Sequence, residues 1–355
     1  MFFYLLLVLP GWLLAEPVTH ILHEGKFKVR LTCASEDSIC VGFKETIKHV
    51  ARFFENALIL KKEIYVAIDM DPTTVQTKLR ATAIAATNTA HFLFKEAPGT
   101  LIPRALCKQQ STCSNNNRVD FTVLINLNKR FYFASDFMRK QDGYSAIDTL
   151  AHEFIHGMGF STKTSGKSCN ANLAPGFITC PGYYENTAGI LFFANSFETH
   201  IYTRSGTKLT SFIERLNMKN QIPLGDPTSK KPQLTDYHLG ITREIEALAS
   251  TSEELYFKTF SGKKIILRTN GKYKPGTSIS HFDKRYEGTK ETLMTEDESL
   301  YYGVHDLEFD GWRTSPFGPL TLEVLGTMGY QLNRNPLFEN SLLGLKQKIY
   351  ENSSW

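Results

Sequence analysis

The chain has 355 residues, and its 40 Lys and Arg residues nearly balance its 36 Asp and Glu residues, which leaves a formal net charge of +4 at pH 7. A charge this small, spread along the chain, excludes the basic stripe of a nucleic-acid-binding protein. The length suffices for one large domain or two small ones, and we expect a monomer.

Residues 1–15 differ from the rest of the chain. An apolar run at 2–9 is followed by a small-residue end at Ala15, which predicts a signal peptide cleaved after Ala15 and a secreted, extracellular protein. The segment lacks Lys and Arg, so an uncleaved anchor is the alternative, although the run is short for a membrane span. No later segment is apolar enough to span, and we expect no stable membrane span in the mature chain.

The six cysteines lie in three sequence-local couples. An even number of cysteines in a secreted chain predicts disulfide bonds, and closure of short loops is the simplest pairing. The expected pairs are Cys33 with Cys40, Cys107 with Cys113, and Cys169 with Cys180. Other connectivities stay open at this point, and the spacing does not match a zinc ribbon.

The first half of the chain predicts an α+β domain. No element is assigned within residues 16–40. Apolar residues recur at helical spacing over 41–61, and residues 63–70 alternate between apolar and polar side chains, so we expect a long helix and then a strand. Residues 121–128 predict a second strand, and residues 144–158 predict a helix with an apolar face.

The second half has weaker signals. Residues 187–202 are apolar enough for a packed segment, and residues 203–240 read as surface loops with one short helix. A helix is expected over 241–251. Two short runs within 255–268 flank a Ser-Gly-Lys turn and predict a hairpin. Residues 319–330 predict an amphipathic helix that ends at a glycine.

Residues 149–161 carry the pattern H-E-x-x-H, in which His152 and His156 flank Glu153. On a helix, positions i and i+4 lie on one face, so both imidazoles can bind one ion. The carboxylate of Glu153 can then reach a water on that ion, which is the arrangement of a hydrolytic zinc site. The alternative is a buried helix whose two histidines only satisfy local hydrogen bonds.

A catalytic zinc ion needs three protein ligands, and two histidines supply only two. In the compact metzincin pattern a glycine turns the chain and a third histidine follows six residues after the second. Gly159 stands at the glycine position, but Thr162 stands where that histidine belongs. His281, followed thirteen residues on by Met294, is the preferred third ligand. Competing candidates are Glu185, His200, His238 and His305.

In chain order, the motifs are H-E-x-x-H-G-x-G-F, a long insertion, S-H-F, L-M and a helix ending in M-G-Y. This order resembles that of the leishmanolysin-type metzincins, which are secreted or surface zinc endopeptidases. The resemblance implies that His152, His156 and His281 bind one catalytic Zn²⁺. It makes Glu153 the general base and Met294 the methionine of the Met-turn, an apolar floor under the ligands.

The chain departs from that family in several places. Phe282 stands where the family usually has Trp, and the number of cysteines is low. No cysteine is placed to act as a latency switch, and a long propeptide is not evident. Tyr301 and Tyr302, just past the Met-turn, are candidates for stabilising an oxyanion, and packing is the alternative role for both.

The resemblance also implies an organisation of the chain as an α+β, metzincin-like zincin. The expected parts are the signal peptide 1–15, an N-terminal segment 16–40, an N-terminal subdomain 41–161 with a mixed sheet and the H-E-x-x-H helix, an inserted segment 162–280, a C-terminal subdomain 281–335 with the third histidine, Met-turn and helix, and a tail 336–355. The expected function is zinc-dependent hydrolysis of peptide bonds in a protein or peptide substrate. The alternative is a catalytically inactive zincin-fold protein with a binding or structural role, against which the intact Glu153 argues.

Overall fold

The structure is a computed structural model that describes residues 17–78, 83–93, 100–113, 118–133, 143–162, 181–183, 189–218, 222–223, 236–269, 271–274, 277–295 and 317–333. It is α+β with a mixed sheet, as predicted. Within these ranges, no helix has the length and apolar character that crossing a membrane requires.

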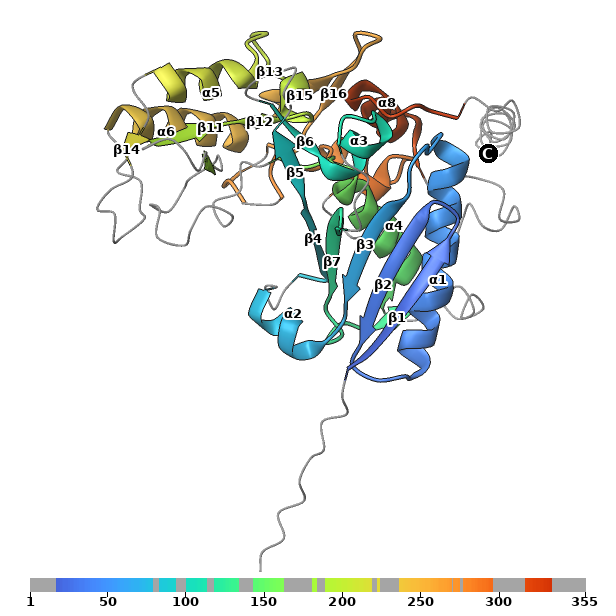
Figure 1. The fold of residues 1–355 in the computed structure, drawn as a ribbon. Coiled ribbons are helices and arrows are strands. Elements are labelled where there is room, and N and C mark those ends of the chain that lie inside the picture. The colour runs from blue at the N-terminus through green and yellow to red at the C-terminus, as the bar shows by residue number, and fades with distance from the viewer. Residues whose placement is uncertain are drawn as a thin grey trace, which may run out of the picture.

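A five-stranded sheet forms the lower half of the molecule in Figure 1. Its strands, in spatial order, are β1 (Val18–Glu24), β2 (Phe27–Cys33), β3 (Ile64–Asp69), β7 (Phe121–Ile125) and β4 (Ala85–Thr89). The inner strands β2, β3 and β7 are parallel, whereas β1 and β4 run antiparallel to their neighbours. Strand β4 is therefore one edge of this sheet.

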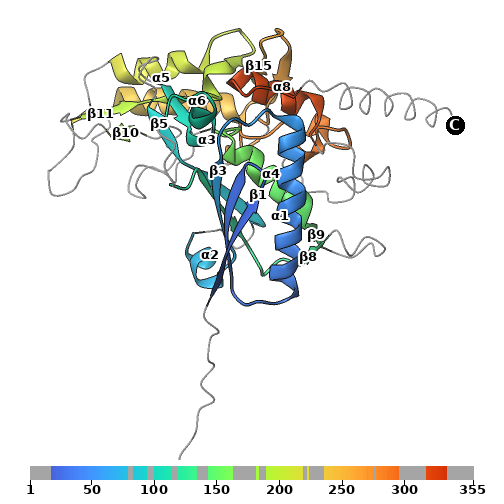
Figure 2. The ribbon, with the colours of Figure 1, turned by 45° about the vertical axis from the view of Figure 1, so that its right-hand side comes forward.

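Two helices lie side by side on one face of the sheet, α1 (Ser38–Ala57) and α4 (Ala146–Gly157) (Figures 1 and 2). Phenylalanine rings join the sheet to both helices. Phe27 of β2 lies 5.8 Å from Phe54 of α1 and 5.7 Å from Phe154 of α4, centroid to centroid. Phe121 of β7 meets Phe154 at 5.3 Å. All four rings are at most 1% exposed, and burying each stabilises the fold by about 1.5–3 kcal/mol.

Residues 16–40, to which the sequence assigned no element, contain the hairpin of β1 and β2. Strand β2 alternates between buried and partly exposed side chains, which is the period of a strand with one face on a core. The hairpin reverses at Gly25, whose φ of +56° is a left-handed conformation that glycine adopts without strain.

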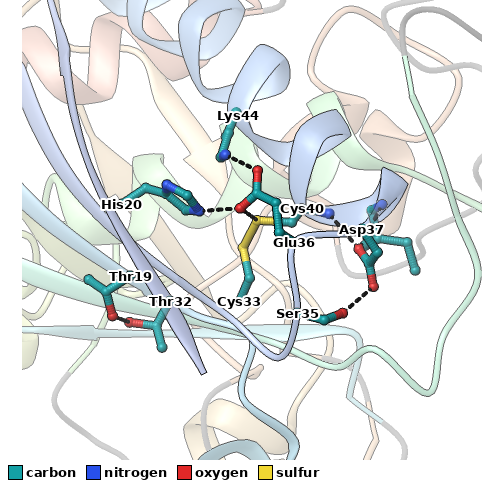
Figure 3. Close-up of polar contacts among 10 residues, drawn as sticks. Thr19, His20, Thr32, Cys33, Ser35, Glu36, Asp37, Cys40 and Lys44 are labelled. Carbon is teal, nitrogen blue, oxygen red and sulfur yellow. Dashed lines mark hydrogen bonds and ion pairs between the residues drawn. A yellow bond between two sulfur atoms is a disulfide. The ribbon is translucent and has the colours of Figure 1, made fainter. Parts of the chain in front are cut away.

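A disulfide joins Cys33 at the end of β2 to Cys40 in the first turn of α1 (Figure 3). Between them, the Asp37 carboxylate accepts hydrogen bonds from the backbone of Ile39 and Cys40 and so caps the helix. Glu36 pairs with His20 of β1 at 2.5 Å. The first helix is therefore tied to the sheet by a covalent bond and by polar contacts.

Further elements lie between residues 72 and 274. They are α2 (Pro72–Lys78), β5 (His91–Leu93), β6 (Thr100–Pro103), α3 (Arg104–Gln109), β8 (Phe131–Tyr132), β9 (Tyr144–Ser145), β10 (Pro181–Tyr183), β11 (Gly189–Phe192), β12 (Ala194–Asn195), η2 (Glu198–His200), β13 (Ile201–Thr203), α5 (Leu209–Met218), β14 (Ile222–Pro223), α6 (Asp236–Ser250), β15 (Leu255–Lys258) and β16 (Lys264–Ile266). The expected hairpin is that of β15 and β16, which extends the strand β13 into a small antiparallel sheet. Helices α5 and α6 pack on each other beside it, in the upper part of Figure 1. The helix expected from residue 241 begins earlier, at Asp236.

The chain continues through η3 (Lys284–Tyr286), η4 (Thr292–Met294) and α8 (Pro319–Met328), the last of which lies in the upper part of Figure 1. Helix α8 ends at Gly329, with φ +113°, as the sequence predicted. Its first turn is capped from outside, because the Glu291 carboxylate accepts hydrogen bonds from the backbone of Leu320 at 2.7 Å and Thr321 at 3.0 Å. This contact ties the Leu-Met turn to the terminal helix.

Candidate metal centre

Helix α4 carries the H-E-x-x-H pattern. It begins at Ser145, whose hydroxyl accepts a hydrogen bond from the backbone N–H of Asp148 at 3.2 Å. The chain reverses after it at Gly159, with φ +108°. A Cβ at this position would lie 2.2 Å from Pro103 Cγ, so only glycine fits both the conformation and the space.

The structure brings His281 against the two histidines of α4. The Nε2 atoms of His152 and His156 are 2.9 Å apart, those of His152 and His281 3.2 Å, and those of His156 and His281 3.3 Å. A tetrahedral zinc ion at about 2.0–2.1 Å from each ligand places its nitrogens roughly 3.3 Å apart. The three rings therefore fit one ion of this size.

The other nitrogen of each ring meets a backbone carbonyl. His152 Nδ1 lies 2.5 Å from the Leu293 oxygen, His156 Nδ1 lies 2.6 Å from the Phe160 oxygen, and His281 Nδ1 lies 2.9 Å from the Thr277 oxygen. A carbonyl can only accept a hydrogen bond, so Nδ1 carries the proton in each neutral ring. All three Nε2 lone pairs then converge on one point, and none of them can donate to another.

Burial keeps these rings neutral. It lowers the pKa of His152, His156 and His281, because a charged imidazole is disfavoured away from water. The neighbouring His152 adds to this effect at the other two rings, and the pKa of His281 falls to about 3. Three neutral imidazoles at pH 7 are in the form that binds a metal ion.

The two ends of the long insertion meet beside the centre. Thr162, which stands where a compact pattern would have its third histidine, donates from its backbone N–H to the hydroxyl of Ser280 at 3.1 Å. Ser280 immediately precedes His281. Thr162 and Ser280 are 118 positions apart along the chain, so the insertion leaves and rejoins the site at one place and brings His281 to the two histidines of α4.

The Leu-Met turn lies at the same centre. The Leu293 carbonyl orients His152, and the Met294 carbonyl accepts a hydrogen bond from the backbone of Phe282 at 2.8 Å. Met294 and Phe282 are fully buried. The Phe282 ring meets Phe160 at 5.1 Å, so Phe282 fills this part of the core.

Glu153 lies beside the first histidine and is only 6% exposed. The hydroxyl of Thr87 on β4 lies 2.6 Å from Glu153 Oε2 and 2.9 Å from the Glu153 carbonyl oxygen. Sequence reasoning missed Thr87, because residues 81–90 are rich in Ala and Thr and predicted no element. The signal that could have found it is the alternation of Thr87 and Thr89, which places both on one face of a strand.

The two competing candidates that the structure describes, His200 and His238, do not join the three histidines. The His200 ring packs against Phe257 at 5.5 Å, and His238 lies in α6 beside Tyr237. A second group with ligand atoms in reach of one another, His20 with Cys33 and Cys40, has its two sulfurs in a disulfide. Cys107 pairs with Cys113 as expected. Glu185, His305, Tyr301, Tyr302, Cys169 and Cys180 lie outside the described residues.

A family model described as SPBPB7E8-like matches residues 12–179. The match includes the five-stranded sheet, α1 and α4 but not His281, and it covers less than half of the 355 residues. Its description names no activity. No curated protein and no solved structure matches the chain.

Proposed function

We propose that the chain is a secreted zinc-dependent endopeptidase of the metzincin type, similar in its site residues to the leishmanolysin group. The observation that carries the proposal is the convergence of three unprotonated Nε2 atoms within 2.9–3.3 Å of one another. Three acceptors held face to face repel each other, and a buried acceptor without a partner is costly. A cation among them removes both costs.

The donor set favours zinc. Neutral imidazole nitrogens suit zinc better than calcium or magnesium, which prefer oxygen ligands. Each imidazole is oriented by a carbonyl, as metal-binding histidines generally are. Three protein ligands leave one position for a water or a substrate oxygen, which is the composition of a catalytic site rather than a closed structural one.

The chemistry that the ion supplies when bound is a lowered pKa for water and polarisation of a substrate carbonyl. The proposed part of Glu153 is to accept the proton of the attacking water and to pass it to the leaving amine nitrogen. Its burial at 6% exposure and its place next to His152 support this role. A purely structural zinc site would need no carboxylate there.

The edge of the sheet supports a peptide as the substrate. Among the described residues, β4 pairs with β7 alone within the five-stranded sheet, and its Thr87 contacts Glu153. The other side of such a strand can pair with an extended peptide through backbone hydrogen bonds, which recognise any sequence. A peptide in this place would run past the three histidines. The disulfides of Cys33–Cys40 and Cys107–Cys113 support secretion, because such bonds persist in oxidising compartments.

The test measures the zinc content of the purified secreted protein and its hydrolysis of casein with and without a chelator. Wild type should hold about one zinc ion and His281→Ala should lose most of it. The matched control His200→Ala removes a histidine outside the centre and should keep the ion. Glu153→Gln should keep zinc but lose turnover by about 100-fold or more.

Two outcomes would contradict the proposal. If His281→Ala retains its zinc, the three-histidine site is wrong. If wild type holds zinc but leaves casein and a peptide library intact, the chain is instead a zincin-fold protein with a binding role.

A further inference from the structure

Thr87 and Thr89 lie on the same face of β4, and their hydroxyls contact different groups of the same helix, α4. The Thr89 hydroxyl donates to the backbone carbonyl of His156 at 3.1 Å. The Thr87 hydroxyl instead lies between the Glu153 carboxylate at 2.6 Å and the Glu153 carbonyl at 2.9 Å. In these contacts Thr89 meets the backbone of α4, while Thr87 also meets the side chain proposed as the general base.

A hydroxyl has one proton and donates fully to one acceptor at a time. A hydrogen bond to a charged carboxylate is stronger than one to a neutral carbonyl, and the carboxylate is also the nearer of the two acceptors. The Glu153 carbonyl lies in helical position to accept from the backbone four residues on. The carboxylate is thus the favoured partner of the Thr87 hydroxyl.

We infer that Thr87 is a positioning residue, whose hydroxyl holds one oxygen of Glu153 so that the other faces the three-histidine centre. The inference rests on the proposed function. A glutamate side chain has several rotatable bonds, and its reactivity as a base depends on hydrogen-bond reach to the proton it takes. Anchoring one oxygen on the rigid sheet removes that freedom before the substrate arrives.

The activity test compares Thr87→Val, Thr87→Ser and the matched control Thr89→Val. Valine has the shape of threonine and suits a strand, so Thr87→Val should fold. We expect Thr87→Val to lower kcat by about tenfold or more with KM changed less than about twofold, and Thr87→Ser to restore kcat to within about threefold. Thr89→Val should keep kcat within about threefold, and zinc content should be the same in all three.

The second readout needs neither metal nor turnover. In metal-free protein, Thr87→Val and Glu153→Ala should couple in urea unfolding. Where Glu153 is present, Thr87→Val should raise the equilibrium constant for unfolding about fivefold. In the Glu153→Ala background, the same substitution should leave that constant nearly unchanged. Thr89→Val and Glu153→Ala should act additively. This double-mutant cycle separates a bond between the two side chains from a general loss of packing.

The outcomes distinguish the two proposals. Three results would overturn the positioning role: wild-type kcat in Thr87→Val, equal kcat losses in Thr87→Val and Thr89→Val, or an additive cycle. Each of them would leave the proposal of a protease that depends on zinc and Glu153 intact. Normal turnover in Glu153→Gln would overturn the proposed function itself, and with it the part given to Thr87. If Thr87→Val is too unstable to assay, Thr87→Ala with the same control decides by the same criteria.

Discussion

The metal-free protein should lose stability as the pH falls, because His281 is buried as a neutral ring. It is 7% exposed, and burial, helped by the nearby His152, lowers its pKa from 6.5 to about 3. The unfolded chain binds a proton at this ring below pH 6.5, whereas the folded chain does so only near pH 3. A lowered pKa therefore contributes stability above the unfolded value and loses that stability as the pH falls.

The size of the effect follows from the proton that only the unfolded chain binds. Below pH 6.5 the free energy of unfolding decreases by roughly 1.4 kcal/mol for each pH unit, which amounts to about 2 kcal/mol between pH 7 and pH 5. Glutamine at position 281 has a polar side chain that does not titrate, so His281→Gln removes this contribution.

The assay is urea unfolding of chelator-treated wild type and His281→Gln, each at pH 7 and pH 5. The decrease in the free energy of unfolding should be larger in wild type by about 2 kcal/mol. The other histidines are shared by both proteins and cancel, except that His281 also helps to lower the pKa of His156, so its removal adds to the difference. Equal decreases in the two proteins would refute the reasoning, since His281 would then be protonated alike in the folded and unfolded chains.

Three further predictions concern residues outside the three-histidine centre. Asp120 is fully buried between Arg104 at 2.9 Å and Lys108 at 2.7 Å, so Asp120→Asn should lower the free energy of unfolding by about 3 kcal/mol in urea titrations, and a change under 1 kcal/mol would contradict the buried pair. Replacing both Cys33 and Cys40 with Ser opens a short loop and should cost about 2.5 kcal/mol, seen as a lower thermal midpoint under non-reducing conditions. Gly159→Ala should reduce bound zinc, because both its φ of +108° and Pro103 oppose a side chain. An unchanged zinc content would show that the chain can reverse there without glycine.

The interactions that the sequence predicted well are local ones. The helix around His152 and His156, its end before Gly159 and the hairpin of β15 and β16 all depend on residues within a few positions of each other. Side-chain periodicity and turn residues encode such contacts directly. The pairing of Cys33 with Cys40 is local for the same reason. The N-terminal hairpin was missed although β2 alternates in the expected way, since its partner β1 has one exposed face and one face that is only partly buried.

The centre itself depends on contacts that no short pattern carries. His281 reaches the helix from 125 residues beyond His156, and the order of motifs suggested it only by resemblance. The physical reason is that His281 is brought to the helix by a contact between the two ends of the insertion. That contact is the hydrogen bond between Thr162 and Ser280.

The sequence alone therefore determined the helix, two of the three rings and the neighbouring carboxylate, because these are set by helical spacing. The tertiary structure alone decided which nitrogen of each ring faces the centre, because the deciding partners are the backbone carbonyls of Leu293, Phe160 and Thr277. Every residue has such a carbonyl, so no residue type marks it. The contact of Thr87 with Glu153 was decided in the same way, by the packing of an edge strand on a helix 66 residues away along the chain.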